Sequence, residues 1–446
     1  MSTTLSSPSE FMTQKQTAAW FAAPPASQSD GTLPEWYVSL QKQAWQRFLE
    51  LPEPTRKNEE WRFADLKKVR FTELVPASPA DDSESLVKRA KESRVDAFAA
   101  HFVFANNRLV HAETDGLPEG ALCLPINEAL AKHGDLVREH FLQEKADLGG
   151  KKFAALHASA TLSGLFVHFP ENCVCENPVV VHHFSGGDMA ATFPHTLVVA
   201  KDNASVSVME TFESIAEGEQ SLAVGMVDLD AVNGARIQYV ALQNASESGA
   251  KHVQLNSTRV GRDSSVKSAC INLGAAWVRN ESINRMVETG ADSRILSANL
   301  ASGIQEYDQR TLQSHEAQHT TSDLLFKNAL YGDSRTIFAG LIDVHPGAHH
   351  TDSFQTCRNL LGSDTAEANA MPGLEINADQ VKCSHGSTSG QISDEEIFYL
   401  QARGIPAETA RRMISLGFLN ESIQKLDGEE LKENLFEQVK RKFTSL

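Results

Sequence analysis

A cysteine and a histidine stand two residues apart in the segment Cys383-Ser384-His385. On a β-strand, residues i and i+2 project from the same face, so this spacing would place a thiol beside an imidazole. Iron and zinc accept both groups as ligands. Lys382 would favour the thiolate of Cys383 if its ammonium group lies near the sulfur. We therefore predict that Cys383 and His385 handle a metal, the alternative being an ordinary last strand of a sheet.

Two other groups have weaker claims to metal chemistry. Cys173 and Cys175 share the same spacing, but buried cysteines more often act as small apolar residues, which favours a place in the core. The segment 345–352 holds His345, His349 and His350, with His315 and His319 upstream. A zinc site needs further ligands at a recognisable spacing, and none is evident. These histidines are expected to form polar ladders or to satisfy turns.

Sequence motifs of a conventional enzyme are absent. The chain has no G-x-S-x-G segment, no Walker A sequence and no glycine-rich dinucleotide fingerprint. Asp263, Asp292 and Asp308 could line a groove like the carboxylates of β-helix enzymes that act on polysaccharides, but nothing in their spacing brings them together. We predict a protein that is not an enzyme. The alternative is a β-helix carbohydrate-active enzyme or a stand-alone metal-binding protein.

The elements that would position these residues are mostly short strands. From about residue 155, runs of four to nine residues rich in Val, Ile, Thr and aromatics alternate with Asn, Gly and Asp turns. A β-sandwich of the immunoglobulin type takes only about 100 residues. A solenoid has no such ceiling, because each coil contacts only its neighbours. The pattern therefore favours a β-helix, with a barrel or jelly roll as the alternative.

Helices are predicted on both sides of these strands. Trp36, Leu40, Ala44 and Phe48 recur at a spacing of four residues, which predicts one apolar helical stripe. We divide the chain into three parts. Residues 1–150 are mostly helical with a disordered lead, residues 151–390 form the β-helix core, and residues 391–446 form a helical region that docks on the β unit or on a partner. Within this last region, Ser393-Asp394-Glu395-Glu396 has the pattern of a capping box.

Composition excludes several classes of partner. The 446 residues include 41 basic and 58 acidic side chains, a formal net charge of -17, which argues against nucleic acid or a membrane surface as a partner. Six cysteines are too few for a disulfide scaffold. There is no secretory signal and no run of about 18 apolar residues that could span a membrane. We expect a cytoplasmic protein.

Four segments resemble a known family. They read LEINADQVKCSHGST at 374–388, DEEIFYL at 394–400, RGI at 403–405 and KNEEWRF at 57–63. Together they look like the SufB/SufD family of the SUF iron–sulfur cluster assembly system, and the resemblance covers most of the chain from about residue 35. Subunits of the SufB type carry acidic residues on either side of the matching histidine. Here Ser384 and Gly386 flank His385, which favours the SufD type.

The resemblance implies a fold and a set of partners. The fold is a right-handed parallel β-helix core flanked by N- and C-terminal helical regions. The protein is a non-enzymatic scaffold that pairs through its β-helix with a SufB-like paralogue, or with a second copy of itself when alone. Its C-terminal region binds a SufC-like ABC ATPase, in a complex of one B, two C and one D subunits.

The resemblance also implies a role for the predicted metal ligands. His385 would lie at the interface with SufB and handle iron or a nascent cluster, with Cys383 as an additional ligand. No cofactor is tightly bound. Iron or an iron–sulfur cluster is shared transiently with SufB, and a reduced flavin is a further candidate ligand of the complex.

Overall fold

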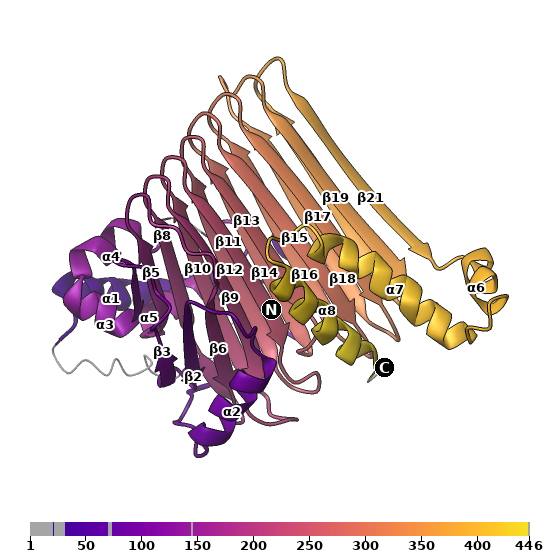
Figure 1. The fold of residues 1–446 in the computed structure, drawn as a ribbon, viewed down its shortest axis with the longest axis horizontal. Coiled ribbons are helices and arrows are strands. Elements are labelled where there is room, and N and C mark those ends of the chain that lie inside the picture. The colour runs from indigo at the N-terminus through magenta and orange to yellow at the C-terminus, as the bar shows by residue number, and fades with distance from the viewer. Residues whose placement is uncertain (1–20, 22–31, 70–73, 144–145, 445–446) are drawn as a thin grey trace, which may run out of the picture.

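The computed structural model describes residues 21, 32–69, 74–143 and 146–444. Its centre is a parallel β-solenoid of about 8 turns. Long strands lie side by side from the indigo N-terminal end to the yellow C-terminal end in Figure 1. Helices cluster at the N-terminal end and on one face. The predicted β-helix core with helical ends is therefore confirmed, and the barrel and jelly-roll alternatives are wrong.

Successive strands alternate between two sheets, so that each coil gives one strand to each sheet. The first sheet runs β20 (Glu367–Ile376), β18 (Arg335–Val344), β16 (Glu306–His315), β14 (Trp277–Met286), β12 (Lys251–Val260), β10 (Leu222–Ala231), β8 (Pro194–Ala200), β5 (Ser163–Phe169) and β4 (Leu122–Pro125), with β7 (Ala190–Thr192) and β1 (Val75–Pro76) beside it. The second runs β21 (Lys382–Gln391), β19 (Asp352–Leu361), β17 (Thr321–Leu330), β15 (Asp292–Ala301), β13 (Ser265–Asn272), β11 (Arg236–Asn244), β9 (Ser205–Ser214), β6 (Val179–Ser185), β2 (Ala100–Ala105) and β3 (Arg108–Glu113).

The number of residues in a coil varies, but the strands of neighbouring coils pair without a register shift. From β10 to β20, partners in neighbouring coils stand 26 residues apart at Lys251 and Trp277 and 32 apart at Arg335 and Glu367. Because the strands themselves pair without a shift, the turns absorb the difference. This variable spacing hides the repeat in the sequence.

A buried asparagine ladder runs through the interior of the solenoid. Asn272, Asn299, Asn328 and Asn359 hold equivalent positions on four successive strands of the second sheet. The first three side-chain amides each donate to the amide oxygen on the next coil at 2.6–2.7 Å, and Asn359 donates to Ser389 Oγ at 3.1 Å. Buried amides need partners, and here the solenoid repeat supplies them.

Helices cover the outer faces near the N-terminal end. They are α1 (Glu35–Glu50), η1 (Glu59–Trp61), α2 (Ser83–Ser93), α3 (Ile126–Lys132), α4 (Gly134–His140) and α5 (Lys151–Ala160). Helix α1 buries Tyr37, Gln41 and Phe48, while Trp36, Leu40 and Ala44 are half-buried. The predicted stripe is correct at Phe48, and elsewhere the centre of the buried face lies one residue further along the chain, at Tyr37 and Gln41.

Three further helices follow the solenoid: α6 (Asp394–Gln401), α7 (Ala407–Ile423) and α8 (Glu429–Thr444). The predicted capping box is present, because Ser393 Oγ accepts from the Glu396 N–H at 3.1 Å and the Glu396 carboxylate accepts from the Ser393 N–H at 3.3 Å. Helices α7 and α8 pack on the second sheet through residues such as Leu419 and Leu435 (Figure 1). The predicted docking on the β unit is confirmed. Within the described ranges, no helix is both long and apolar enough to cross a membrane.

Candidate functional site

The solenoid ends in two strands with open edges. In the described part of the chain, β20 pairs only with β18, and β21 pairs only with β19. Every residue of β21 except Cys383 is exposed. The other edge of each strand therefore presents backbone N–H and C=O groups that another strand could pair with.

Cys383 and His385 lie on this last strand, on the face that points into the solenoid. Cys383 pairs in register with Ser353, and His385 with Gln355, both of which are buried inward-facing residues of β19. The predicted shared face is thus confirmed. Because no further coil covers β21, His385 is exposed, while Cys383 is half-buried against the small cluster around Ile342.

The thiol of Cys383 is not activated by its neighbours. Burial raises its pKa, and the Asp352 carboxylate raises it further, while the Ser353 backbone lowers it. The predicted activation by Lys382 is wrong, since adjacent residues on a strand project to opposite faces. The thiol is therefore protonated near neutral pH, and a metal ion bound there would have to displace its proton.

The prediction that Cys173 and Cys175 belong to the core is confirmed. Cys173 and Cys175 are half-buried and pack against the apolar core between the two sheets. The Cys175 thiol donates to the Asn177 carbonyl at 3.3 Å. Burial raises the pKa of both thiols.

The histidines between 315 and 350 serve the turns and the polar interior, as predicted. His315 is buried and bonds Thr320 Oγ1 and Ser322 Oγ, both at 2.8 Å. The rings of His319 and His350 stack with centroids 4.7 Å apart. The remaining two bond oxygen atoms: His345 Nε2 lies 3.1 Å from the Asp343 carboxylate, and His349 Nδ1 lies 3.2 Å from the Asp379 carbonyl.

The three aspartates considered as an enzyme groove do not share one surface. Asp308 is buried on the first sheet between Arg279 and Arg310, at 2.6 Å from each. Asp292 begins β15 of the second sheet and lies 3.3 Å from Arg294. Asp308 is fully buried, so it does not line a surface groove with Asp263 and Asp292.

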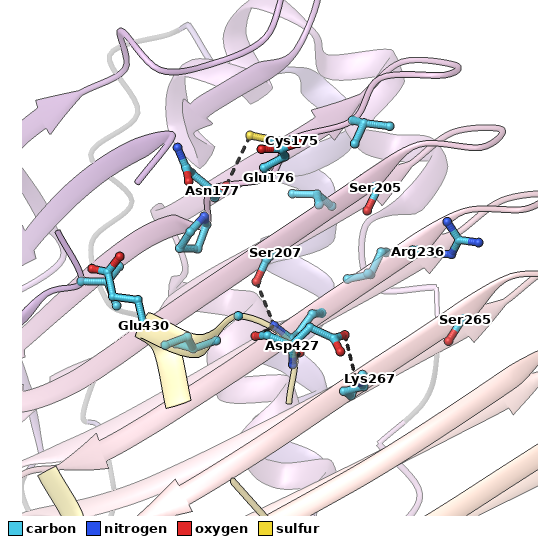
Figure 2. Close-up of a pocket in the computed structure, with 18 of the residues that line it drawn as sticks. Cys175, Glu176, Asn177, Ser205, Ser207, Arg236, Ser265, Lys267, Asp427 and Glu430 are labelled. Atoms are coloured by element: carbon cyan, nitrogen blue, oxygen red, sulfur yellow. Dashed lines mark hydrogen bonds and ion pairs between the residues drawn. The ribbon is translucent and has the colours of Figure 1, made fainter. Parts of the chain in front are cut away.

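A cavity of about 660 Å³ lies between the second sheet and the turn before α8. In Figure 2, Lys267 reaches the Asp427 carboxylate, at 2.7 Å. Gln238 accepts from the Asp427 N–H at 2.7 Å and donates to the Asp427 carbonyl at 3.1 Å. These contacts hold the C-terminal helices on the solenoid. No sequence pattern indicates this cavity, because its walls come from parts of the chain that are far apart. They include the strands between residues 205 and 294 and the residues near 430.

These features define a class of protein: a parallel β-solenoid with helical ends, one open end, and a thiol and an imidazole on its last strand. Two family models match the chain. One is described as SUF system FeS cluster assembly, SufBD core domain, and matches residues 182–418. The other, SufBD protein N-terminal region, matches residues 32–181. The chain belongs to the SufBD family.

Similar proteins include the iron-sulfur cluster assembly protein SufD of Bacillus subtilis, 25% identical over 423 residues, which are 92% of this chain and 94% of that protein. The protein of the same name from Escherichia coli is 27% identical over 405 residues, 89% of this chain and 91% of that protein. A SufBD family protein of Mycobacterium leprae is 32% identical over 201 residues, 43% of this chain and 51% of that protein.

Proposed function

We propose that this protein is a SufD-type scaffold subunit of a SUF complex, where it helps iron acquisition and cluster assembly without catalysing a reaction itself. The observation that carries the proposal is the position of Cys383 and His385 on a strand whose outer edge is open. Family membership supports it, as does the presence of Ser384 and Gly386 beside His385.

The partner at the open end is a SufB-like paralogue. Two strands of ten residues, β20 and β21, offer backbone groups to the strands of a second solenoid. Such a partner would extend both sheets and cover the inward face of β21. His385 would then lie between the two solenoids, where iron or a cluster could be bound by ligands from both. In the isolated chain, a second copy can use the same edges.

The partner at the C-terminal helices is a SufC-like ABC ATPase. Phe398 and Tyr399 on α6 are 70% and 58% exposed, and Met413 on α7 is 47% exposed. Large apolar side chains gathered at a surface are typical of a protein interface. Helix α6 extends beyond the solenoid in Figure 1, away from the part of α8 that packs on the second sheet.

The proposed mechanism connects the two contacts. ATP binding would draw two SufC subunits together and pull on the C-terminal helices of both solenoid subunits. The interface at β20 and β21 would open and expose His385 to iron or to a cluster held largely by SufB thiolates. A ligand set that includes imidazole holds iron less firmly than thiolates alone, which suits a cluster that must be released. The cluster is the cargo, and a reduced flavin would be a further ligand of the complex.

The test is His385→Ala in a complex reconstituted with SufB and SufC. We expect cluster reconstitution to fall about 10-fold or more, since a ligand is lost, while size-exclusion chromatography shows an intact complex. His349→Ala, a half-buried histidine on a neighbouring turn, is the matched control. Normal reconstitution in an intact His385→Ala complex would rule out the role given to His385.

A further inference from the structure

Two imidazoles and a carboxylate meet at the opposite end of the second sheet from His385. His101 lies on β2, and His111 and Glu113 lie on β3, which forms an antiparallel pair with β2. His101 is directly opposite Glu113 in the register, and residues in such a pair project to the same side. One potential ligand atom from each of the three residues lies within 4.8 Å of the others.

A chain of hydrogen bonds fixes the tautomer of His101. The Ser93 hydroxyl donates its single proton to the backbone carbonyls of Arg89 and Ala90, at 3.1 and 3.3 Å. With its proton on a carbonyl, the hydroxyl accepts from His182 Nε2–H at 3.2 Å, which is the arrangement that gives both carbonyl and imidazole a partner. His182 Nδ1 is then unprotonated and accepts from His101 Nε2–H, also at 3.2 Å. By this reasoning His101 Nδ1 carries a free lone pair.

That lone pair is buried and has no hydrogen-bond partner among the described residues. His101 has no exposed surface. An unsatisfied buried acceptor of this kind destabilises the fold, and a ligand at Nδ1 would remove that destabilisation. The bond from His101 Nε2 to His182 also matches the outer hydrogen bond that orients a metal-binding histidine in proteins.

The charge state of the cluster suits a cation. Burial, with Arg94 and His111, lowers the pKa of His101 to about 4, so its imidazole is neutral at pH 7. Hydrogen bonding by Lys91 lowers the pKa of Glu113 to about 2, so its carboxylate is ionised. A neutral imidazole and an ionised carboxylate are the forms that bind metals.

We propose that His101, His111 and Glu113 form a binding site for a divalent transition metal of the zinc and iron(II) class. Two imidazoles and one carboxylate are a ligand set that both ions use, with one or more positions left for water. The site does not include Cys383 or His385, so a test of this proposal and a test of the proposed iron-handling role are independent.

The Lys91 ammonium group and the N–H of His111 oppose the metal in the present arrangement. Lys91 Nζ lies 2.7 Å from Glu113 Oε1, and His111 Nε2 lies 2.8 Å from the same oxygen. A bound metal ion would replace the proton on His111 Nε2 and compete with the Lys91 ammonium group for the carboxylate. Removal of the lysine charge should therefore tighten binding, whereas removal of a ligand should weaken it. A nonspecific metal contact would not respond in these opposite directions.

The experiment is a titration of the purified full chain, without an oligohistidine tag, with Zn²⁺ by calorimetry and with Co²⁺ by visible absorption. A Cys383→Ser/His385→Ala background removes the other metal-binding candidate. We expect one saturable site with the d–d bands of imidazole-bound Co²⁺. His111→Gln and Glu113→Gln, at half-buried positions, should each weaken binding at least about 10-fold. Lys91→Gln should strengthen it several-fold.

His133→Gln, at a half-buried histidine between α3 and α4, is the control and should bind as the parent does. Far-UV circular dichroism verifies that each variant is folded. The proposal is overturned if the parent shows no saturable site, if His111→Gln and Glu113→Gln bind like the parent, or if Lys91→Gln binds more weakly.

Discussion

The two ends of the solenoid are built in opposite ways. At the N-terminal end the sheets finish in antiparallel strands, β3 and β4, and α1 to α5 cover the neighbouring faces. All six residues of β2 are buried. At the C-terminal end the sheets finish in the parallel strands β20 and β21, and β21 is almost fully exposed. One end is closed by its own chain, and the other ends in open strand edges. Three experiments test this difference.

The largest expected effect comes from matched phenylalanines near the two ends. Phe102 on β2 is 1% exposed and lies in the core between the sheets, whereas Phe354 on β19 is 43% exposed. Phe102→Ala should lower the free energy of unfolding by about 3–5 kcal/mol, because it leaves a cavity. Phe354→Ala should lower it by less than about 1 kcal/mol. Urea unfolding followed by circular dichroism measures both, and equal losses would contradict the comparison.

A charge placed at the open end should weaken binding to a partner but leave the stability of the isolated chain almost unchanged. Ser387→Lys places a charge on the inward face of β21, which is exposed in the isolated chain. We expect affinity for the SufB-like partner to fall about 100-fold, since burying an unpaired ammonium group costs several kcal/mol. The free energy of unfolding of the isolated chain should change by no more than about 0.5 kcal/mol. Ser39→Lys, at an exposed position of helix α1, is the control, and tight pairing by Ser387→Lys would place the interface elsewhere.

Acid should lower the free energy of unfolding through a histidine buried in the covered interior. Burial lowers the pKa of His315 to about 3, from an ordinary value of 6.5, so the unfolded chain binds a proton there that the folded chain does not. The stabilisation from the neutral imidazole is complete above pH 6.5 and is lost as the pH falls towards 3. His315→Gln should reduce the slope of unfolding free energy against pH by about 1.4 kcal/mol per pH unit between pH 6 and 4. Phe354→Ala should keep the parent slope, and an unchanged slope in His315→Gln would show that His315 is not held neutral.

Much of the fold follows from local sequence patterns. Short β-branched runs and Asn or Gly turns indicate the strands, and the number of strands indicates a solenoid rather than a sandwich. The asparagine ladder escapes notice because turns of different length separate Asn272, Asn299, Asn328 and Asn359. The buried face of α1 depends on its packing against α5, so a four-residue apolar spacing misplaces it by one residue.

The two candidate sites also differ in how much of their geometry could be predicted from the sequence. Cys383 and His385 are two residues apart on one strand, so their common face could be predicted from strand geometry alone. Their difference in burial could not, since it depends on where the last coil ends. His101, His111 and Glu113 come together through the register of β2 with β3, and the neutral state of His101 depends on burial. No local pattern in the sequence carries either fact.

The variable coil length has a consequence for how such a chain can change. An extra residue in a turn leaves the strand register intact, whereas one inside a strand would turn every following side chain to the opposite face. The molecule can therefore grow or shrink safely in whole coils. Each added coil would move the terminal edge outward by one strand spacing, about 4.8 Å, and leave the sequence of that edge as it was. The distance between the closed N-terminal end and the open edge is thus a quantity that can be set in steps, by evolution or by design.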